Sequence, residues 1–304
     1  MTPSVQPQGP SYLDAIHDGK NQWWRYFIAL FVIAFMWLVA GSTPVLAYAI
    51  VVSADGDPAT IIDPDTNQFV GVNPTWPFIA IMLSFVMLLI GLYIVVRFVH
   101  GRKFMGLVTS ASAVNWRRVG EGFGIWFLLA AVLAVVEAVL HPNRYQLTFD
   151  PINFFPFAVA ALILIPVQTT TEELVFRGYV LQSASLFSRN RIILSIVSGI
   201  LFLGPHLTNP EVGEDVFLLP LFYFSLGAFL AYISLKDNNL ELALGVHAAN
   251  NLFTALFANY ANSALATPAI FTARDFDSAY NVFGALIAMA VFYLWFYWPF
   301  HKPA

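Results

Sequence analysis

The chain reads PFAVAALILIPVQTTTEELVFRGYV from Pro156 to Val180. This stretch begins as one of the most apolar parts of the sequence, yet Glu172, Glu173 and Arg177 then follow within six residues. Ionisable side chains at membrane depth are costly, and they commonly mark functional sites with a partner nearby. The stretch therefore predicts a membrane helix that carries a functional site. We expect the rest of the chain to be a membrane scaffold that brings partners to it.

The composition agrees with a membrane protein. Of the 304 residues, 59% are hydrophobic and 11% are charged, whereas soluble domains carry about 25% charged residues. The long apolar runs lack the alternation of barrel strands, so we predict an all-α, polytopic helical bundle. The absence of cysteine excludes thiol catalysis, disulfides and cysteine-based metal sites. The net charge of −4, without a basic patch, argues against a nucleic-acid partner.

About eight apolar segments approach the roughly 20 residues that a spanning helix needs. They cover about 26–52, 76–96, 122–140, 154 onward, 192–206, 217–235, 240–260 and 280–297. Lys and Arg are enriched in cytoplasmic loops. With the N-terminus inside, only Arg144 and Arg274 of the 14 Lys and Arg residues fall outside. We therefore predict a multi-pass protein of the cell membrane with both termini cytoplasmic.

The polar first 22 residues include three prolines. We expect them to be a loosely ordered cytoplasmic tail and residues 23–304 to be a single transmembrane domain.

The spacing of the ionisable residues suggests a division of roles. Glu173 and Arg177 are four residues apart, in the favourable order for an ion pair on one helix face. Glu172 lies about 100° round the helix. We therefore expect Glu173 and Arg177 to neutralise each other and Glu172 to point into the bundle. A purely structural salt-bridge cluster is the alternative.

Two histidines are predicted to join this stretch. The only turn signal between Glu172 and His206 is Ser188–Arg191, centred at the midpoint of the two, so an antiparallel hairpin places them at the same height. His247 and Asn251 share one face of a later helix, about 12 Å from the turn at 236–239. We expect the neighbouring Asn250 to face elsewhere. A hydrogen-bonded packing role is the alternative for His206.

Two further acidic residues are weaker candidates. Glu137 and His141 are spaced as an i, i+4 pair near the outer end of a helix, where we expect water to reach them. Glu121 stands at the inner start of the same helix, where a carboxylate complements the helix dipole. We predict structural roles for all three.

Three motifs occur in order along the chain: Glu172-Glu173-x-x-x-Arg177, Phe202-x-x-x-His206 and His247-x-x-x-Asn251. Together they resemble the motifs of the CAAX-protease and bacteriocin-processing (CPBP, or ABI) family of intramembrane glutamic endopeptidases. The resemblance covers about residues 155–260. It implies that Glu172 and His206 hold and activate a water, that His247 and Asn251 stabilise the oxyanion, and that Glu173 and Arg177 support them. It implies no cofactor.

Two other functional interpretations of the same residues stay open. In a zinc metalloprotease, Glu172, His206 and His247 would instead be ligands of Zn²⁺. A protein without catalysis, such as a scaffold, an immunity protein or a transporter, also carries polar residues at depth. For the protease, the expected partners are the lipid bilayer and a membrane-associated peptide or protein substrate. That substrate stays open between a prenylated C-terminus, a leader peptide and a membrane-anchored regulator.

Overall fold

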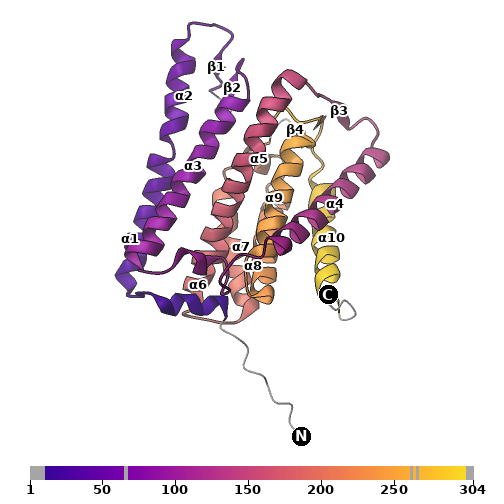
Figure 1. The fold of residues 1–304 in the computed structure, drawn as a ribbon. Coiled ribbons are helices and arrows are strands. Elements are labelled where there is room, and N and C mark those ends of the chain that lie inside the picture. The colour runs from indigo at the N-terminus through magenta and orange to yellow at the C-terminus, as the bar shows by residue number, and fades with distance from the viewer. Residues whose placement is uncertain (1–10, 65–67, 261–262, 265–266, 299–304) are drawn as a thin grey trace.

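A computed structural model describes residues 11–64, 68–260, 263–264 and 267–298. Long helices stand side by side and form most of the molecule (Figure 1). Within the described residues, six helical segments are long and apolar enough to cross a membrane: Trp23–Ala54, Thr75–Val99, Trp116–Leu140, Pro151–Ala184, Leu218–Asp237 and Ser278–Tyr297. The prediction of an all-α, multi-pass bundle is confirmed at this level.

Three of the six segments combine several helical elements. The first contains α1 (Trp23–Ala34), a π-helix η2 (Phe35–Ala40) and α2 (Thr43–Ala54), and the second contains α3 (Thr75–Ile94) and a π-helix η3 (Val95–Val99). The fourth contains α5 (Pro151–Glu173), a π-helix η5 (Leu174–Val180) and α6 (Leu181–Ala184). The others are single helices, α4 (Trp116–Leu140), α8 (Leu218–Asp237) and α10 (Ser278–Tyr297).

The other two expected helices are shorter. Helices α7 (Arg191–His206) and α9 (Glu241–Leu256) have 16 residues each. At 1.5 Å per residue each is about 24 Å long, less than the roughly 30 Å of a hydrocarbon core. The helix expected over 240–260 ends early because the chain turns into strand β4 (Ala258–Tyr260).

Short strands, which the sequence analysis did not predict, lie at one end of the bundle (Figure 1). Strands β1 (Ile61–Ile62) and β2 (Phe69–Val70) pair antiparallel. Strand β5 (Phe271–Ala273) pairs antiparallel with β3 (Tyr145–Leu147) and parallel with β4. The segment that follows α4 is thereby tied to the segment between α9 and α10.

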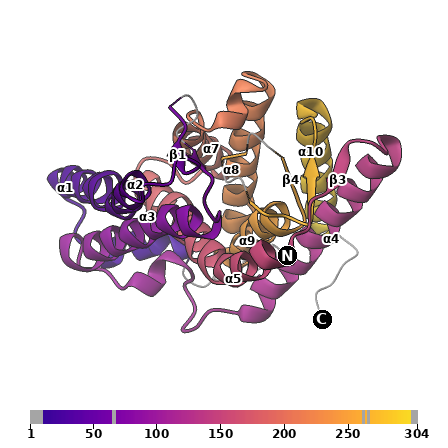
Figure 2. The same cartoon turned by 90° about the horizontal axis from the view of Figure 1, so that it is seen from above.

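Glycines allow close contacts between helices. A Cβ atom on Gly245 of α9 would lie 2.1 Å from the carbonyl oxygen of Val119 on α4. Similarly, a Cβ on Gly199 of α7 would lie 2.9 Å from the carbonyl oxygen of Phe224 on α8. Small residues of this kind let the backbones of membrane helices approach closely. Viewed from above, α9 stands at the centre of the bundle, among α4, α5 and α8 (Figure 2).

The expectation of a loosely ordered tail is wrong for the described part of residues 1–22; residues 1–10 lie outside the described residues. Tyr12–Asp18 forms a 3-10 helix, η1, that begins with a capping box between Ser11 and Asp14. Tyr12 and Ile16 are almost fully buried. The Tyr12 hydroxyl donates a hydrogen bond to the carbonyl of Arg177. The N-terminal segment (residues 11–22) is thus packed against the helix that carries the predicted site.

One turn joins several elements at this end of the molecule. Asn238, which ends α8 in the left-handed conformation with φ 63°, accepts a hydrogen bond from the backbone N–H of Tyr12 at 2.8 Å. Its neighbour Asp237 accepts from Arg118 at the start of α4 and from Tyr297 at the end of α10. Helix η1 and the last turn of α10 therefore lie at the same end of the bundle, opposite the strands (Figure 1).

Candidate active site

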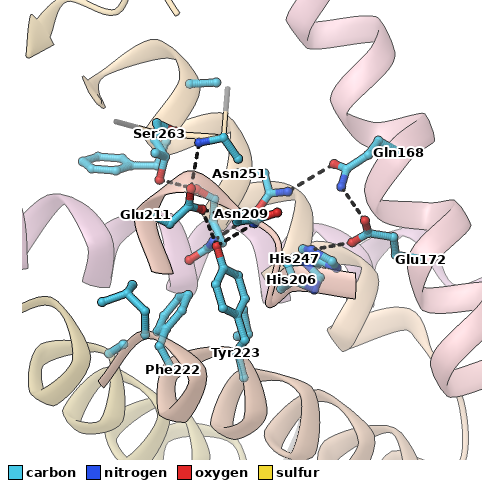
Figure 3. Close-up of a pocket in the computed structure, with 18 of the residues that line it drawn as sticks. Gln168, Glu172, His206, Asn209, Glu211, Phe222, Tyr223, His247, Asn251 and Ser263 are labelled. Carbon is cyan, nitrogen blue, oxygen red and sulfur yellow. Dashed lines mark hydrogen bonds and ion pairs between the residues drawn. The ribbon is translucent and has the colours of Figure 1, made fainter. Parts of the chain in front are cut away.

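A cavity of about 700 Å³ runs between the helices. Glu172 from α5, His206 from α7, and His247 and Asn251 from α9 all line it. Figure 3 shows Glu172, His206 and His247 gathered in one part of the cavity. The structure thus brings together the four residues that were predicted to be catalytic. The two predicted supporting residues, Glu173 and Arg177, are fully buried and are not part of the cavity lining.

The helix that carries the two glutamates changes its winding directly after them. The α-helical turns of α5 end at Glu173, and the π-helix η5 begins at Leu174. Segments of π-helix occur frequently at functional sites, because the wider turn redirects side chains. Before the glutamates, the hydroxyls of Thr169 and Thr171 donate to the carbonyls of Ile165 and Val167, at 3.0 and 2.7 Å. The hydroxyls of both threonines are thus bonded to the backbone of their own helix.

The predicted ion pair is present and completely buried. A guanidinium nitrogen of Arg177 lies 2.8 Å from Oε1 of Glu173, and both side chains are 0% exposed. A second nitrogen donates to the carbonyl of Gly227 on α8 at 3.1 Å. The guanidinium also lies over the ring of Phe202, 4.3 Å from its centroid. The pair therefore links η5 to both α7 and α8.

His247 lies between the two glutamates. Its Nδ1 is 2.7 Å from Oε1 of Glu173, and its Nε2 is 3.4 Å from Oε2 of Glu172. The first contact is a short hydrogen bond that orients the ring. The second is long, and no described residue donates a hydrogen bond to this Glu172 oxygen. A buried acceptor of this kind is normally satisfied by protein or by an ordered water, so Oε2 of Glu172 is suited to hold a water.

His206 is the last residue of α7. Helix α7 begins at Arg191 behind the expected turn and continues through Pro205. The Nδ1–H group of His206 donates to the carbonyl of Phe202 at 2.7 Å. This bond fixes the neutral ring as the tautomer whose Nε2 carries the lone pair. The half-buried ring therefore has an acceptor nitrogen available to the cavity.

Gln168 is a site residue that the sequence analysis missed. Its amide nitrogen donates to Oε1 of Glu172 at 2.9 Å, and its amide oxygen accepts from Asn251 at 3.1 Å. It stands one helical turn before Glu172, and this i, i+4 spacing was the available signal. Asn250, which was expected to face elsewhere, also lines the cavity and donates to the side-chain oxygen of Asn251 at 3.1 Å. The position of Asn251 is thus set by two neighbouring amides.

The acidic residues outside the motifs have different partners from those expected. Glu137 is 3% exposed, and its carboxylate binds Arg144 at 2.8 Å and Tyr145 at 2.5 Å instead of forming a water-exposed pair with His141. Among the described residues, His141 contacts it only through the backbone, by an N–H bond to the Glu137 carbonyl. Glu211, which the sequence analysis did not single out, is also buried and lines the cavity.

The donor groups do not form an evident metal site. Across the described part of the chain, no group of three or more His, Asp or Glu side chains is arranged to hold a metal ion.

Comparison with known proteins gives two matches. The family model of type II CAAX prenyl endopeptidases, Rce1-like, matches residues 150–253. The uncharacterized protein YyaK of Bacillus subtilis (strain 168) is 32% identical over 280 residues, which are 90% of this chain and 91% of YyaK. This chain belongs to the Rce1-like family. No solved structure matches the chain.

At the level of the Rce1-like family, the chain is a membrane protease. The matched residues 150–253 include Glu172, His206, His247 and Asn251. The segment matched by the family model therefore contains the motif residues that line the cavity.

Proposed function

We propose that this protein is an intramembrane endopeptidase of the glutamate type, which hydrolyses a peptide bond within or beside the membrane. Glu172 and His206 hold a water, with Oε2 of Glu172 and Nε2 of His206 as its acceptors. The supporting observation is that these two acceptors line one cavity and that described residues leave both without a hydrogen-bond donor.

The residues of this cavity can carry out each proton transfer of the proposed reaction. Glu172 takes a proton from the water as its oxygen bonds to the peptide carbonyl carbon, which gives a tetrahedral oxyanion. His247 with a proton on both ring nitrogens, donating from Nε2, and the amide N–H of Asn251 stabilise that oxyanion; donors placed where charge develops contribute about 100-fold or more in rate. Glu172 then passes the proton to the leaving nitrogen as the C–N bond breaks. Glu173 and Arg177 hold His247 in place.

No metal takes part in the proposed reaction. The zinc alternative would use Glu172, His206 and His247 as ligands, and no group of three or more His, Asp or Glu side chains among the described residues is arranged to hold a metal ion. Metal analysis of the purified protein and its rate in the presence of a chelator separate the two versions. The metal-free version predicts an unchanged rate with EDTA.

We further propose that eight helical segments lie in the membrane, with α7 and α9 as short members, and that η1 and the end of α10 face the cytoplasm. Most Lys and Arg residues belong to the segments at the end of the bundle where η1 lies, and such an enrichment is typical of cytoplasmic ends. The substrate is a membrane-associated peptide or protein that enters from the bilayer. Leu30 and Leu38 of the first span support this entry, because they line the cavity and are also 66% and 64% exposed.

The experiment is a comparison of membranes from cells that carry wild-type protein, Glu172→Gln or Glu121→Gln. Glu121 is the matched control, because it is a half-buried glutamate in an ion pair with Arg117 and does not line the cavity. Proteomic analysis of peptide termini is expected to find a cleavage product that Glu172→Gln loses and Glu121→Gln retains. Identical termini in all three membranes would favour a non-catalytic scaffold, immunity or transport protein.

A further inference from the structure

The imidazole of His206 packs against two aromatic rings. The ring of Phe202, one turn earlier in α7, lies 4.4 Å away between centroids, and the ring of Tyr223 from α8 lies 4.3 Å away at an interplanar angle of 31°. Because Nδ1 is tied to the backbone of its own helix, the direction of Nε2 depends on the tilt of the ring. Tyr223 is the one of these two neighbours that belongs to another helix, so it fixes the tilt relative to the rest of the cavity.

Tyr223 is itself anchored at its tip. Its hydroxyl donates to Oε1 of Glu211 and accepts from the amide of Asn209 at 3.0 Å. The other oxygen of Glu211 accepts from the backbone N–H of Ala264 at 2.8 Å. Figure 3 shows this group of Asn209, Glu211 and Tyr223 in the cavity lining. The ring that packs on His206 is therefore held at one end by a network that reaches two loops.

The hydrogen bond between Tyr223 and Glu211 indicates that Tyr223 does more than fill space beside His206. Glu211 is 3% exposed, and a buried carboxylate carries a desolvation penalty that requires compensating hydrogen bonds. A phenylalanine at position 223 would fill the same space and would need no buried carboxylate. A hydrogen bond to an ionised acceptor is roughly twice as strong as a neutral one. Such a bond resists sliding or rotation of the ring.

We propose that Tyr223 and Glu211 are positioning residues that hold the His206 ring at the tilt that directs Nε2 to the water. The proposal rests on the proposed function of His206. It predicts that loosening the His206 ring lowers turnover and leaves substrate binding unchanged. The reason is that Tyr223 contacts His206, which holds the water, and does not bind the peptide.

The kinetic test uses purified full-length protein and a synthetic peptide that spans the bond whose cleavage Glu172→Gln abolishes. Tyr223→Leu removes the ring and is expected to lower kcat by about 100-fold, as a catalytic group displaced by about 1 Å does. Tyr223→Phe and Glu211→Gln keep the shapes and weaken the anchor, and they are expected to lower kcat by about tenfold. KM is expected to change less than about twofold in all three.

The matched control is Tyr232→Phe, which removes a hydroxyl from the same helix at a ring that packs against Tyr293 and does not line the cavity. It is expected to retain wild-type kcat. Thermal melting of every variant establishes which ones fold. If Tyr223→Leu does not fold, the comparison of Glu211→Gln with Tyr232→Phe decides, because both preserve side-chain shape.

A second readout follows the His206 ring directly. The chain has six histidines, so nitrogen NMR of ¹⁵N-histidine-labelled protein, assigned with His206→Gln, resolves the ring nitrogens. The proposal predicts a shifted or broadened His206 Nε2 signal in Tyr223→Leu and an unchanged one in Tyr232→Phe. Folded Tyr223→Leu and Glu211→Gln with wild-type kcat and unchanged signals would overturn it. If no cleavage product depends on Glu172, the proposed function fails, and the nitrogen signals alone decide whether Tyr223 orients His206.

Discussion

At the scale of single residues, the site depends on charges that are buried in pairs. The Glu173–Arg177 pair was predictable because both members stand on one helix at a fixed spacing. The bridge from Gln168 to Asn251 was not predictable in the same way. It joins α5 to α9, and one sequence does not contain the register between two helices.

The buried pair gives the first prediction. Arg177→Ala leaves the carboxylate of Glu173 buried without its cation, and we expect a loss of about 3–5 kcal/mol in the free energy of unfolding. The control is Arg117→Ala, which breaks an ion pair of the same i, i+4 spacing in which Arg117 is 77% exposed. An exposed pair contributes at most about 1 kcal/mol. Melting of the two purified variants measures both effects, and equal losses would contradict the role of burial.

At the scale of elements, the helices were predicted more closely than their ends and contacts. Apolar runs located the segments, because each run is set by local composition. The helix expected over 240–260 was too long because strand β4 depends on pairing with residues 271–273. The buried Tyr12–Asp18 helix was missed, although Ser11 and Asp14 are spaced as a capping box. Its burial comes from Gln182 and Asn238, which lie far away in the sequence.

The contact between α4 and α9 gives a second prediction. Gly245→Ala places a methyl group 2.1 Å from the Val119 carbonyl oxygen. We expect this overpacking to cost about 1–3 kcal/mol. Gly124→Ala on α4 is the control, since nothing lies within 4 Å of its Cβ position, and alanine favours a helix by up to about 1 kcal/mol over glycine. Melting temperatures that fall equally in both variants would contradict the close approach of α4 and α9.

At the scale of the whole molecule, the N-terminal segment packs against the helix that carries the site, since the Tyr12 hydroxyl donates to the Arg177 carbonyl. His100 is part of this connection, beyond the end of the second span. Its Nδ1–H donates to the Lys20 carbonyl at 2.8 Å, and its Nε2 accepts from the Tyr179 hydroxyl at 2.9 Å. Burial, aided by the positive charges of Arg102 and Arg25, lowers the pKa of His100 below its usual value. The backbone bond to Lys20 opposes this shift in part.

The direction of this shift predicts a loss of order in acid. The unfolded chain takes up a proton near pH 6.5, above the pKa of folded His100. Stability therefore falls as the pH drops below about 6.5, and the loss is complete below the folded pKa. We expect faster amide hydrogen exchange of residues 11–22 at pH 5.5 than at pH 7.5, after correction for intrinsic rates. His100→Gln should remove most of this difference, and an equal difference in both proteins would exclude His100 as its cause.

The central claim is that Glu172 activates a water for peptide hydrolysis without a metal. Its most direct measurement is the cleavage rate of the identified peptide by purified protein in lipid vesicles with EDTA, for wild type and Glu172→Gln. Loss of the base and of its hold on the water is expected to lower the rate by about 1,000-fold or more, while wild type keeps its full rate. A Glu172→Gln protein that cleaves within about tenfold of wild type, or a wild type that EDTA inactivates, would contradict the claim.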